Sequence, residues 1–136
     1  MNQEYKRILV PVDGSQQSIN AFKKAVQIAK RNNAELRLVT VVDKADNALE
    51  AEAIERDLDG FFKALEAHAK KENLTITKDV KFGSARKLIA EELVKDWNID
   101  LIVMGATGKG RIAKLIVGTV TNHVVRHARC DVLIAR

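Results

Sequence analysis

The sequence alternates between short apolar segments and amphipathic segments, and this alternation limits the possible folds more than any other feature. Apolar runs rich in β-branched residues, with one segment of alternating polarity, predict five strands, at residues 7–12, 36–42, 74–82, 101–104 and 132–135. Apolar residues at helical spacing predict four helices, one after residue 15 and the others at 48–72, about 84–97 and about 119–128. Strands that alternate with helices favour an α/β fold, in which helices cover both faces of an open, mostly parallel sheet.

The polarity of the strands also predicts their order in the sheet. Runs 7–12 and 101–104 are apolar throughout, as central strands are, whereas 74–82 alternates and suits an edge. Right-handed crossovers then give the strand order 3-2-1-4-5. The strand order reverses between strands one and four, whose ends lie at Asp13 and Gly105, and open α/β sheets bind ligands in the crevice at such a switch point.

Length and composition indicate one domain that spans residues 1–136. Hydrophobic residues make up 46% of the chain, yet no uninterrupted apolar stretch approaches the roughly 20 residues that cross a bilayer. Residues 1–13 lack the apolar core of a secretory signal. Cys130 is the only cysteine, which excludes internal disulfides and fits a reducing compartment. We therefore expect a cytoplasmic protein.

The net charge of +5 is unevenly distributed along the chain. Residues 1–42 carry 7 basic and 3 acidic groups, residues 43–100 carry 10 and 14, and residues 101–136 carry 6 and 1. A basic chain is a candidate nucleic-acid binder, but only 4% of the residues are aromatic, too few for a base-stacking surface. A small ligand that carries phosphates is the more attractive hypothesis.

A glycine motif supplies the strongest local evidence for such a ligand. Gly105 and Gly108 are followed, after nine residues, by Gly118 and Thr119. Glycines let a ligand approach the main chain closely, and we expect Gly118 and Thr119 to open the last helix, where unpaired N–H groups favour a phosphate. The loop basic residues Lys109, Arg111 and Lys114 could add charge. The alternative is that these glycines only mark turns; the spacing is neither that of a Walker loop nor that of a dinucleotide fingerprint.

These motifs together resemble the universal stress protein family. The resemblance rests on Val10-Pro-Val-Asp-Gly-Ser15, on Val39-Thr-Val-Val-Asp43, on Gly83 and on the G-x2-G-x9-G-(S/T) motif, and it covers essentially the whole chain. It implies a Rossmann-like sheet of the adenine nucleotide alpha hydrolase type. It also implies membership of the subgroup that binds ATP through this glycine motif.

The resemblance further implies which residues hold the nucleotide. Asp13, with Pro11 and Val12, and the main chain of Val41 would contact the adenine and ribose end, and Met104 would line the ribose side. The phosphates would be held by Gly105, Gly108, Gly118, Thr119, Val120 and Thr121. A Mg²⁺ or Mn²⁺ ion would be carried mainly by the phosphates. The chain departs from the family pattern at Ser84 and at Cys130-Asp131, where relatives often have proline.

Other candidate residues favour structural roles. Asp13 suits a helix cap about as well as a ligand contact, and its place at the crevice favours the ligand. His123 and His127 are four residues apart but lack a third metal ligand in the sequence pattern, so we expect no metal site. We interpret His68 as solvated, Trp97 as a cap on the core and Cys130 as structural. Because no nucleophile-and-base pair is evident, any ATP hydrolysis should be slow.

The last strand suggests how the protein assembles. Residues Val132 to Ala135 are apolar on both faces although the strand lies at an edge, which invites pairing with a second copy. The leading hypothesis is a small homodimeric regulator or sensor whose ATP state tunes its interactions with unknown protein partners. The alternative hypothesis is an ATP-hydrolysing or nucleotidyl-transferring enzyme of the same fold. A basic nucleic-acid binder is the third hypothesis.

Overall fold

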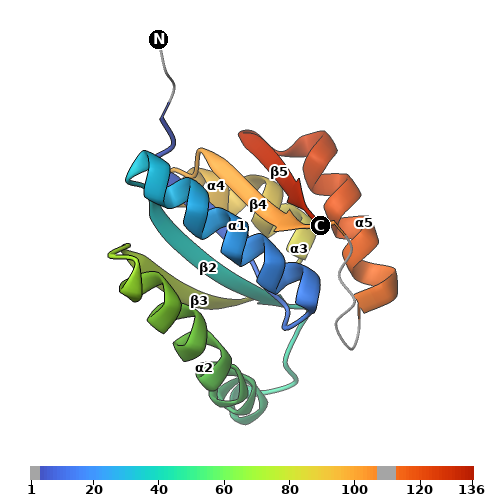
Figure 1. Ribbon diagram of the computed structural model, residues 1–136. Helices are drawn as coiled ribbons and strands as arrows, with labels where there is room; N and C mark the ends of the chain where they lie inside the picture. Colours follow the sequence, from blue (N-terminus) through green and yellow to red (C-terminus); the bar gives the residue numbers. More distant parts are fainter. Residues whose placement is uncertain (1–3, 107–112) are drawn as a thin grey trace.

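The computed structural model describes residues 4–106 and 113–136, the latter with side chains from Val120 onward. Its centre is a parallel sheet with the strand order β3-β2-β1-β4-β5. This arrangement confirms the predicted sheet and its order (Figure 1). The strands are β1 (Arg7–Pro11), β2 (Glu35–Val42), β3 (Ile76–Phe82), β4 (Leu101–Gly105) and β5 (Asp131–Ala135).

The helices cover both faces of the sheet, as predicted (Figure 1). Their bounds are α1 (Gln16–Asn32), α2 (Ala48–Lys71), α3 (Ala85–Lys87), the π-helical segment η1 (Leu88–Glu92), α4 (Leu93–Asp96) and α5 (Ala113–His127). The third predicted helix is thus one helical stretch with a wider turn in its middle. Ser84 caps its start by accepting a hydrogen bond from the Lys87 N–H, at 3.4 Å.

The predicted start of the last helix, at about Thr119, was wrong. Helix α5 begins at Ala113, so Gly118 and Thr119 lie inside it. The preceding residues include alanine, lysine and leucine, which favour a helix, and a glycine in a helix interior costs only about 1 kcal/mol relative to alanine. The glycine was therefore too weak a signal for a helix boundary.

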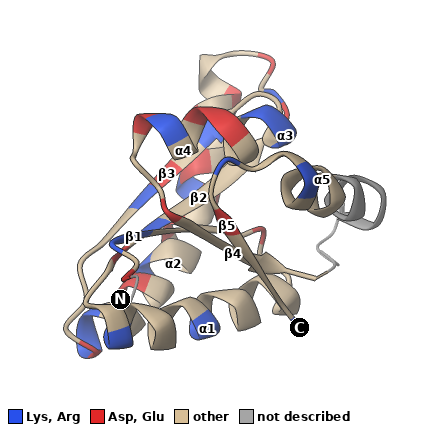
Figure 2. Cartoon of the chain, turned by 90° about the horizontal axis from the view of Figure 1, so that it is seen from above, with Lys and Arg blue, Asp and Glu red and all other residues tan. Residues whose placement is uncertain are grey.

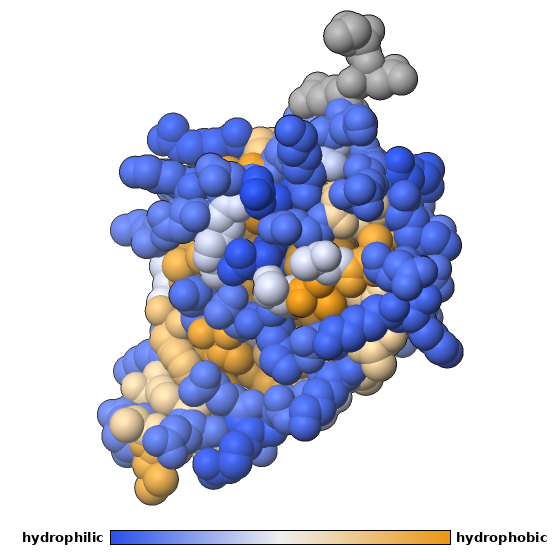
Figure 3. All heavy atoms as spheres, turned by 90° about the vertical axis from the view of Figure 1, so that its left-hand side faces the viewer, coloured by the Kyte–Doolittle hydropathy of each residue, from blue (hydrophilic) through white to orange (hydrophobic). Residues whose placement is uncertain are grey.

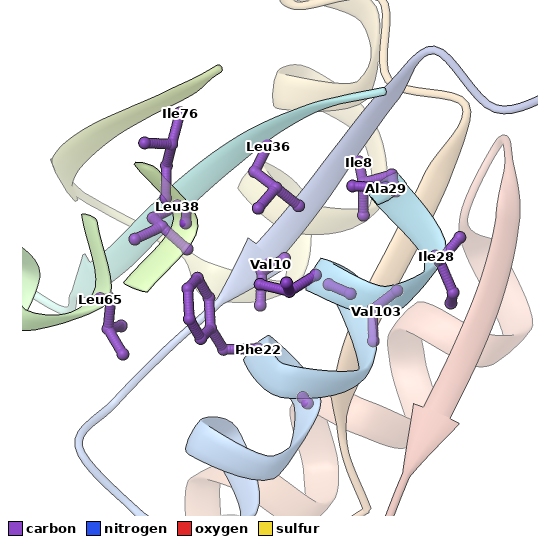
Figure 4. Packing of buried hydrophobic residues seen from close by; sticks show 14 of the residues in the cluster. Ile8, Val10, Phe22, Ile28, Ala29, Leu36, Leu38, Leu65, Ile76 and Val103 are labelled. Atoms are coloured by element: carbon purple, nitrogen blue, oxygen red, sulfur yellow. The ribbon is translucent and has the colours of Figure 1, made fainter. Parts of the chain in front are cut away.

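Alternate residues of the central strands enter two separate cores. Ile8, Val10 and Leu38 pack under α1 and α2, around the Phe22 side chain at the middle of the first core (Figure 4). Leu9 and Ile102 pack on the opposite face, under η1, α4 and α5. Because residues 8–10 of β1 and 101–104 of β4 each meet one core or the other, these stretches must be apolar throughout.

Polar side chains tie the N-terminal segment to the start of the sheet. The Asp100 carboxylate accepts hydrogen bonds from the Lys6 and Arg7 N–H groups, at 2.8 and 3.0 Å. The Tyr5 hydroxyl donates to the Asp131 carboxylate at 2.6 Å, and this hydrogen bond is the main reason why the pKa of Tyr5 is raised. Asp131 thus connects the edge strand β5 to the residues before β1.

Gly105 lies where the first turn of α1 crosses the end of β4. A Cβ atom at this position would stand 2.9 Å from the main-chain carbonyl group of Gln17. That distance is shorter than real Cβ atoms tolerate, and the neighbour is backbone, which yields poorly. The glycine is therefore required by helix packing, a reason that the sequence motif does not reveal.

We expect Gly105→Ala to lower the free energy of unfolding by about 1–3 kcal/mol, because the added methyl group overpacks the α1–β4 contact. Urea unfolding followed by circular dichroism measures this change. Gly60→Ala is the matched control, since a Cβ at Gly60 in α2 meets nothing within 4 Å and alanine favours a helix. Equal effects of the two substitutions would contradict the packing explanation.

Burial makes Cys130 a poorly reactive thiol. The half-buried side chain has its pKa raised from 9.0 to about 11, first by burial and then by the negative charges of Asp131 and Asp100. At pH 8 the thiolate fraction is then about a hundredfold below that of a thiol with the ordinary pKa.

We expect iodoacetamide to alkylate Cys130 of the folded protein at pH 8 far more slowly than Cys130 of the urea-unfolded chain. Mass spectrometry measures both rates, and equal rates would refute this prediction.

Candidate functional site

The ends of β1, β2 and β4 converge at one edge of the sheet, where the sequence predicts the ligand crevice. Val12 and Asp13 follow β1, and Met104 and Gly105 end β4. Val12 and Met104 are buried, in the first and second core respectively, whereas Pro11 is half-buried and Asp13 is exposed. Asp13 is therefore the accessible charged group of this edge among these residues.

A tight turn holds Asp13 beside the start of α1. Its Oδ1 accepts a hydrogen bond from the Ser15 N–H at 2.9 Å, and Gly14 between them has a φ of +84° that favours glycine. The cap of α1 is Ser15, whose hydroxyl accepts a hydrogen bond from the Ser18 N–H at 3.1 Å. Because Ser15 caps the helix, the exposed Asp13 carboxylate remains available to a ligand.

The main chain of Val41 faces the space beyond the end of β1. Odd-numbered residues of β2 direct their N–H and C=O groups toward β1: Glu35 N–H donates to Lys6 O, and Val39 O accepts from Val12 N–H, both at 2.9 Å. Even-numbered residues bond toward β3. The β1–β2 register ends at Pro11 opposite Val39. Val41 therefore presents one donor and one acceptor to the crevice.

A buried threonine closes the strand pair just before Val41. The Thr40 hydroxyl donates to the Val12 carbonyl oxygen at 2.8 Å, so a side chain takes over where the main-chain ladder stops. The sequence reading missed Thr40; its only signal was a hydroxyl residue within the apolar run 36–42. This contact fixes the end of β1 against β2 and so sets the edge of the crevice.

Helix α5 contributes an unusual polar group. Thr121 is only 7% exposed, and its hydroxyl has no hydrogen-bond partner among the residues that the structure describes. A buried hydroxyl without a partner costs about 1–3 kcal/mol, so such a group calls for an explanation. Val120, by contrast, is an ordinary buried residue of the second core.

The glycine motif is only partly within the described residues. Gly105 ends β4 and packs against α1, while Gly108, Lys109 and Arg111 lie outside the described residues. Gly118, Thr119 and Lys114 lie in α5. Since α5 begins at Ala113, the argument that Gly118 and Thr119 offer the unpaired N–H groups of a helix start was wrong. Their role in phosphate binding stays a prediction.

The remaining candidate residues have contacts of other kinds. The rings of His123 and His127 lie 4.4 Å apart, and no group of three or more metal-ligating side chains occurs within residues 4–106 and the described part of α5 and β5. Trp97 packs against the second core, as expected, and the Arg37 guanidinium stacks 3.9 Å from the centre of its ring. None of the helices in the described ranges is long and apolar enough to cross a membrane.

Comparisons with known proteins agree with this architecture. The sequence model "Universal stress protein family" matches residues 4–136. A Staphylococcus haemolyticus protein named for the same family is 35% identical over 140 residues, covering 97% of this chain and 85% of that protein. The solved structure of universal stress protein UspA from Lactobacillus plantarum is 34% identical, with a TM-score of 0.70 and coverage of 99% of this chain and 100% of that one.

A further solved structure contains a nucleotide. It is described as a universal stress protein in complex with cAMP, is 28% identical, and aligns with a TM-score of 0.75 over 98% of each chain. The family model spans nearly all of this sequence, and the relatives share both its length and its sheet. This chain therefore belongs to the universal stress protein family.

Proposed function

We propose that this protein binds ATP in the crevice between the ends of β1 and β4. The observation that carries the proposal is the donor and acceptor pair of the Val41 main chain, set beside the exposed Asp13 carboxylate. The edge of adenine offers a complementary amino donor and ring-nitrogen acceptor, and a carboxylate suits the hydroxyls of a ribose. Pro11, Val12 and Met104 would border this end of the nucleotide.

The phosphates would lie along the glycine motif and the first half of α5. The buried hydroxyl of Thr121, which has no partner in the described residues, fits a donor reserved for a ligand oxygen. Gly105, Gly108, Gly118, Thr119 and Val120 complete the proposed set. Asp13 is the exposed carboxylate beside the end of β1, so Mg²⁺ or Mn²⁺ would be held mainly by phosphate oxygens and water. The relative that binds cAMP supports an adenine nucleotide as the ligand class.

The same proposal gives the protein a regulatory role rather than a catalytic one. Asp13 is the one carboxylate of the proposed site, and a lone carboxylate supplies no acid–base pair, so hydrolysis of bound ATP is slow. Strand β5 lies at the edge of the sheet with Val132, Leu133 and Ile134 only half-buried, which suits pairing with a second copy in the cytoplasm. In this proposal the nucleotide state of the homodimer tunes its contacts with other proteins.

Titration calorimetry with Mg-ATP tests the site. We expect binding to the native protein, and a loss of at least about tenfold in affinity in Asp13→Ala and in Thr121→Val, because each removes a hydrogen bond to a polar or charged ligand group. Thr121→Val should keep or raise the melting temperature, because the unpartnered hydroxyl disappears. Thr77→Val on β3, exposed and remote, is the matched control and should leave the affinity unchanged.

The alternatives give different results in these experiments. No heat from the well-folded native protein would refute ATP binding. Turnover above about one per minute that Asp13→Ala abolishes would favour an enzyme. Retention on DNA that falls steeply with salt and ignores ATP would favour the nucleic-acid reading.

A further inference from the structure

Helix α2 is longer than the strand on which it packs. Its 24 residues extend about 36 Å, whereas the 7 residues of β3 extend about 23 Å. The buried residues of α2 are Phe62, Leu65 and Ala69, all in its second half. Figure 1 shows the first turns of α2 below the sheet, beyond the strand ends. The first turns of α2 thus overhang the body of the protein.

The apolar stripe of α2 nevertheless continues into this overhang. Leu58 packs against the first core, and Ile54 and Ala51 follow at spacings of four and three residues, which places them on the same helix face. Both are half-buried. The apolar stripe therefore continues beyond the part of α2 that packs against the first core.

An open groove of about 440 Å³ lies beneath this end of the helix. Its apolar walls include Ala48 and Ala51 from α2 and Phe82, which is 37% exposed at the end of β3. Figure 3 shows apolar residues gathered at the lower left of one face, at the height where α2 begins in Figure 1. The groove is large enough for apolar side chains of another molecule.

The surroundings of the groove are strongly acidic in a chain of net charge +5. Residues 43–60 contain seven acidic and two basic residues. Glu50 and Asp57 flank the stripe on one side of the helix, Glu55 flanks it on the other, and all three are exposed. Asp43 and Lys44 line the groove itself, so one basic residue accompanies the acidic rim.

We propose that the overhang groove, defined by Ala45, Ala48, Ala51 and Phe82, docks a basic amphipathic helix of a partner protein. Apolar side chains of that helix enter the groove, and flanking lysines or arginines face the acidic rim. Charge complementarity of this kind directs binding and excludes acidic competitors. The docking needs no nucleotide and so goes beyond the proposed ATP site.

A second copy of this chain suits the groove less well. Its most basic exposed element is α1, whose only charged residues are Lys23, Lys24, Lys30 and Arg31 (Figure 2). The exposed residues of α1 are all polar, so α1 offers no apolar anchor.

A labelled helical peptide made of leucine and lysine, with one leucine face, is the test probe. Fluorescence anisotropy should show binding at low salt, and a peptide of the same composition in scrambled order should bind at least about tenfold more weakly. Ala51→Lys places a charged chain in the groove and should reduce the affinity at least about tenfold. Leu49→Lys is the matched control, because Leu49 is 73% exposed on the opposite side of α2 and makes the same change of charge.

The two variants separate shape from charge. Equal losses in Ala51→Lys and Leu49→Lys, equal binding of the scrambled peptide, or no binding at all would overturn the proposal. A dimer that Ala51→Lys alone dissociates in light scattering would assign the groove to a second copy and also overturn it. Should Ala51→Lys fail to fold by circular dichroism, Phe82→Ser removes the other wall and should show the same loss.

Discussion

Strands β1 and β4 pair at the centre of the sheet and are covered on both faces, and the rest of the structure is arranged around them. Ile8 and Leu9 enter opposite cores, so the pair is held by two independent sets of helices. Gly105 lets the first turn of α1 approach the end of β4 until the two main chains are in contact. The crevice is the space left where both strands stop. Packing of the two cores thus determines where the crevice lies. The polar groups around the crevice line a position that this packing has already determined.

Much of this frame could be predicted from the sequence because burial on two faces leaves a clear pattern. The apolar central strands, the alternating edge strand and the right-handed crossovers were sufficient for the order β3-β2-β1-β4-β5. The start of α5 could not be predicted, since glycine costs a helix too little to mark its boundary. The π-helical turn η1 leaves no pattern at all in the apolar spacing.

The candidate site was predictable in position but less so in its atoms. Asp13 was placed correctly at the crevice, and the structure shows that the helix cap is Ser15 instead. The Thr40 hydroxyl and the packing role of Gly105 depend on contacts with distant segments, at Val12 and Gln17, which no local pattern records. The charge distribution also became clearer. Many acidic residues of the middle of the sequence lie in residues 43–60, around the overhanging first turns of α2. A protein of positive net charge thus has a locally negative surface.

Successive residues of β2 direct their main-chain N–H and C=O groups alternately toward β1 and toward β3. This alternation affects how mutations at the crevice should be interpreted. Val41 faces the crevice with its N–H and C=O groups, which every residue except proline carries in full. Side-chain replacements at this position leave those groups in place, so an alanine scan would test only the packing of the Val41 side chain against the second core. The proposed recognition of a ligand through the Val41 backbone would therefore escape detection by side-chain mutagenesis.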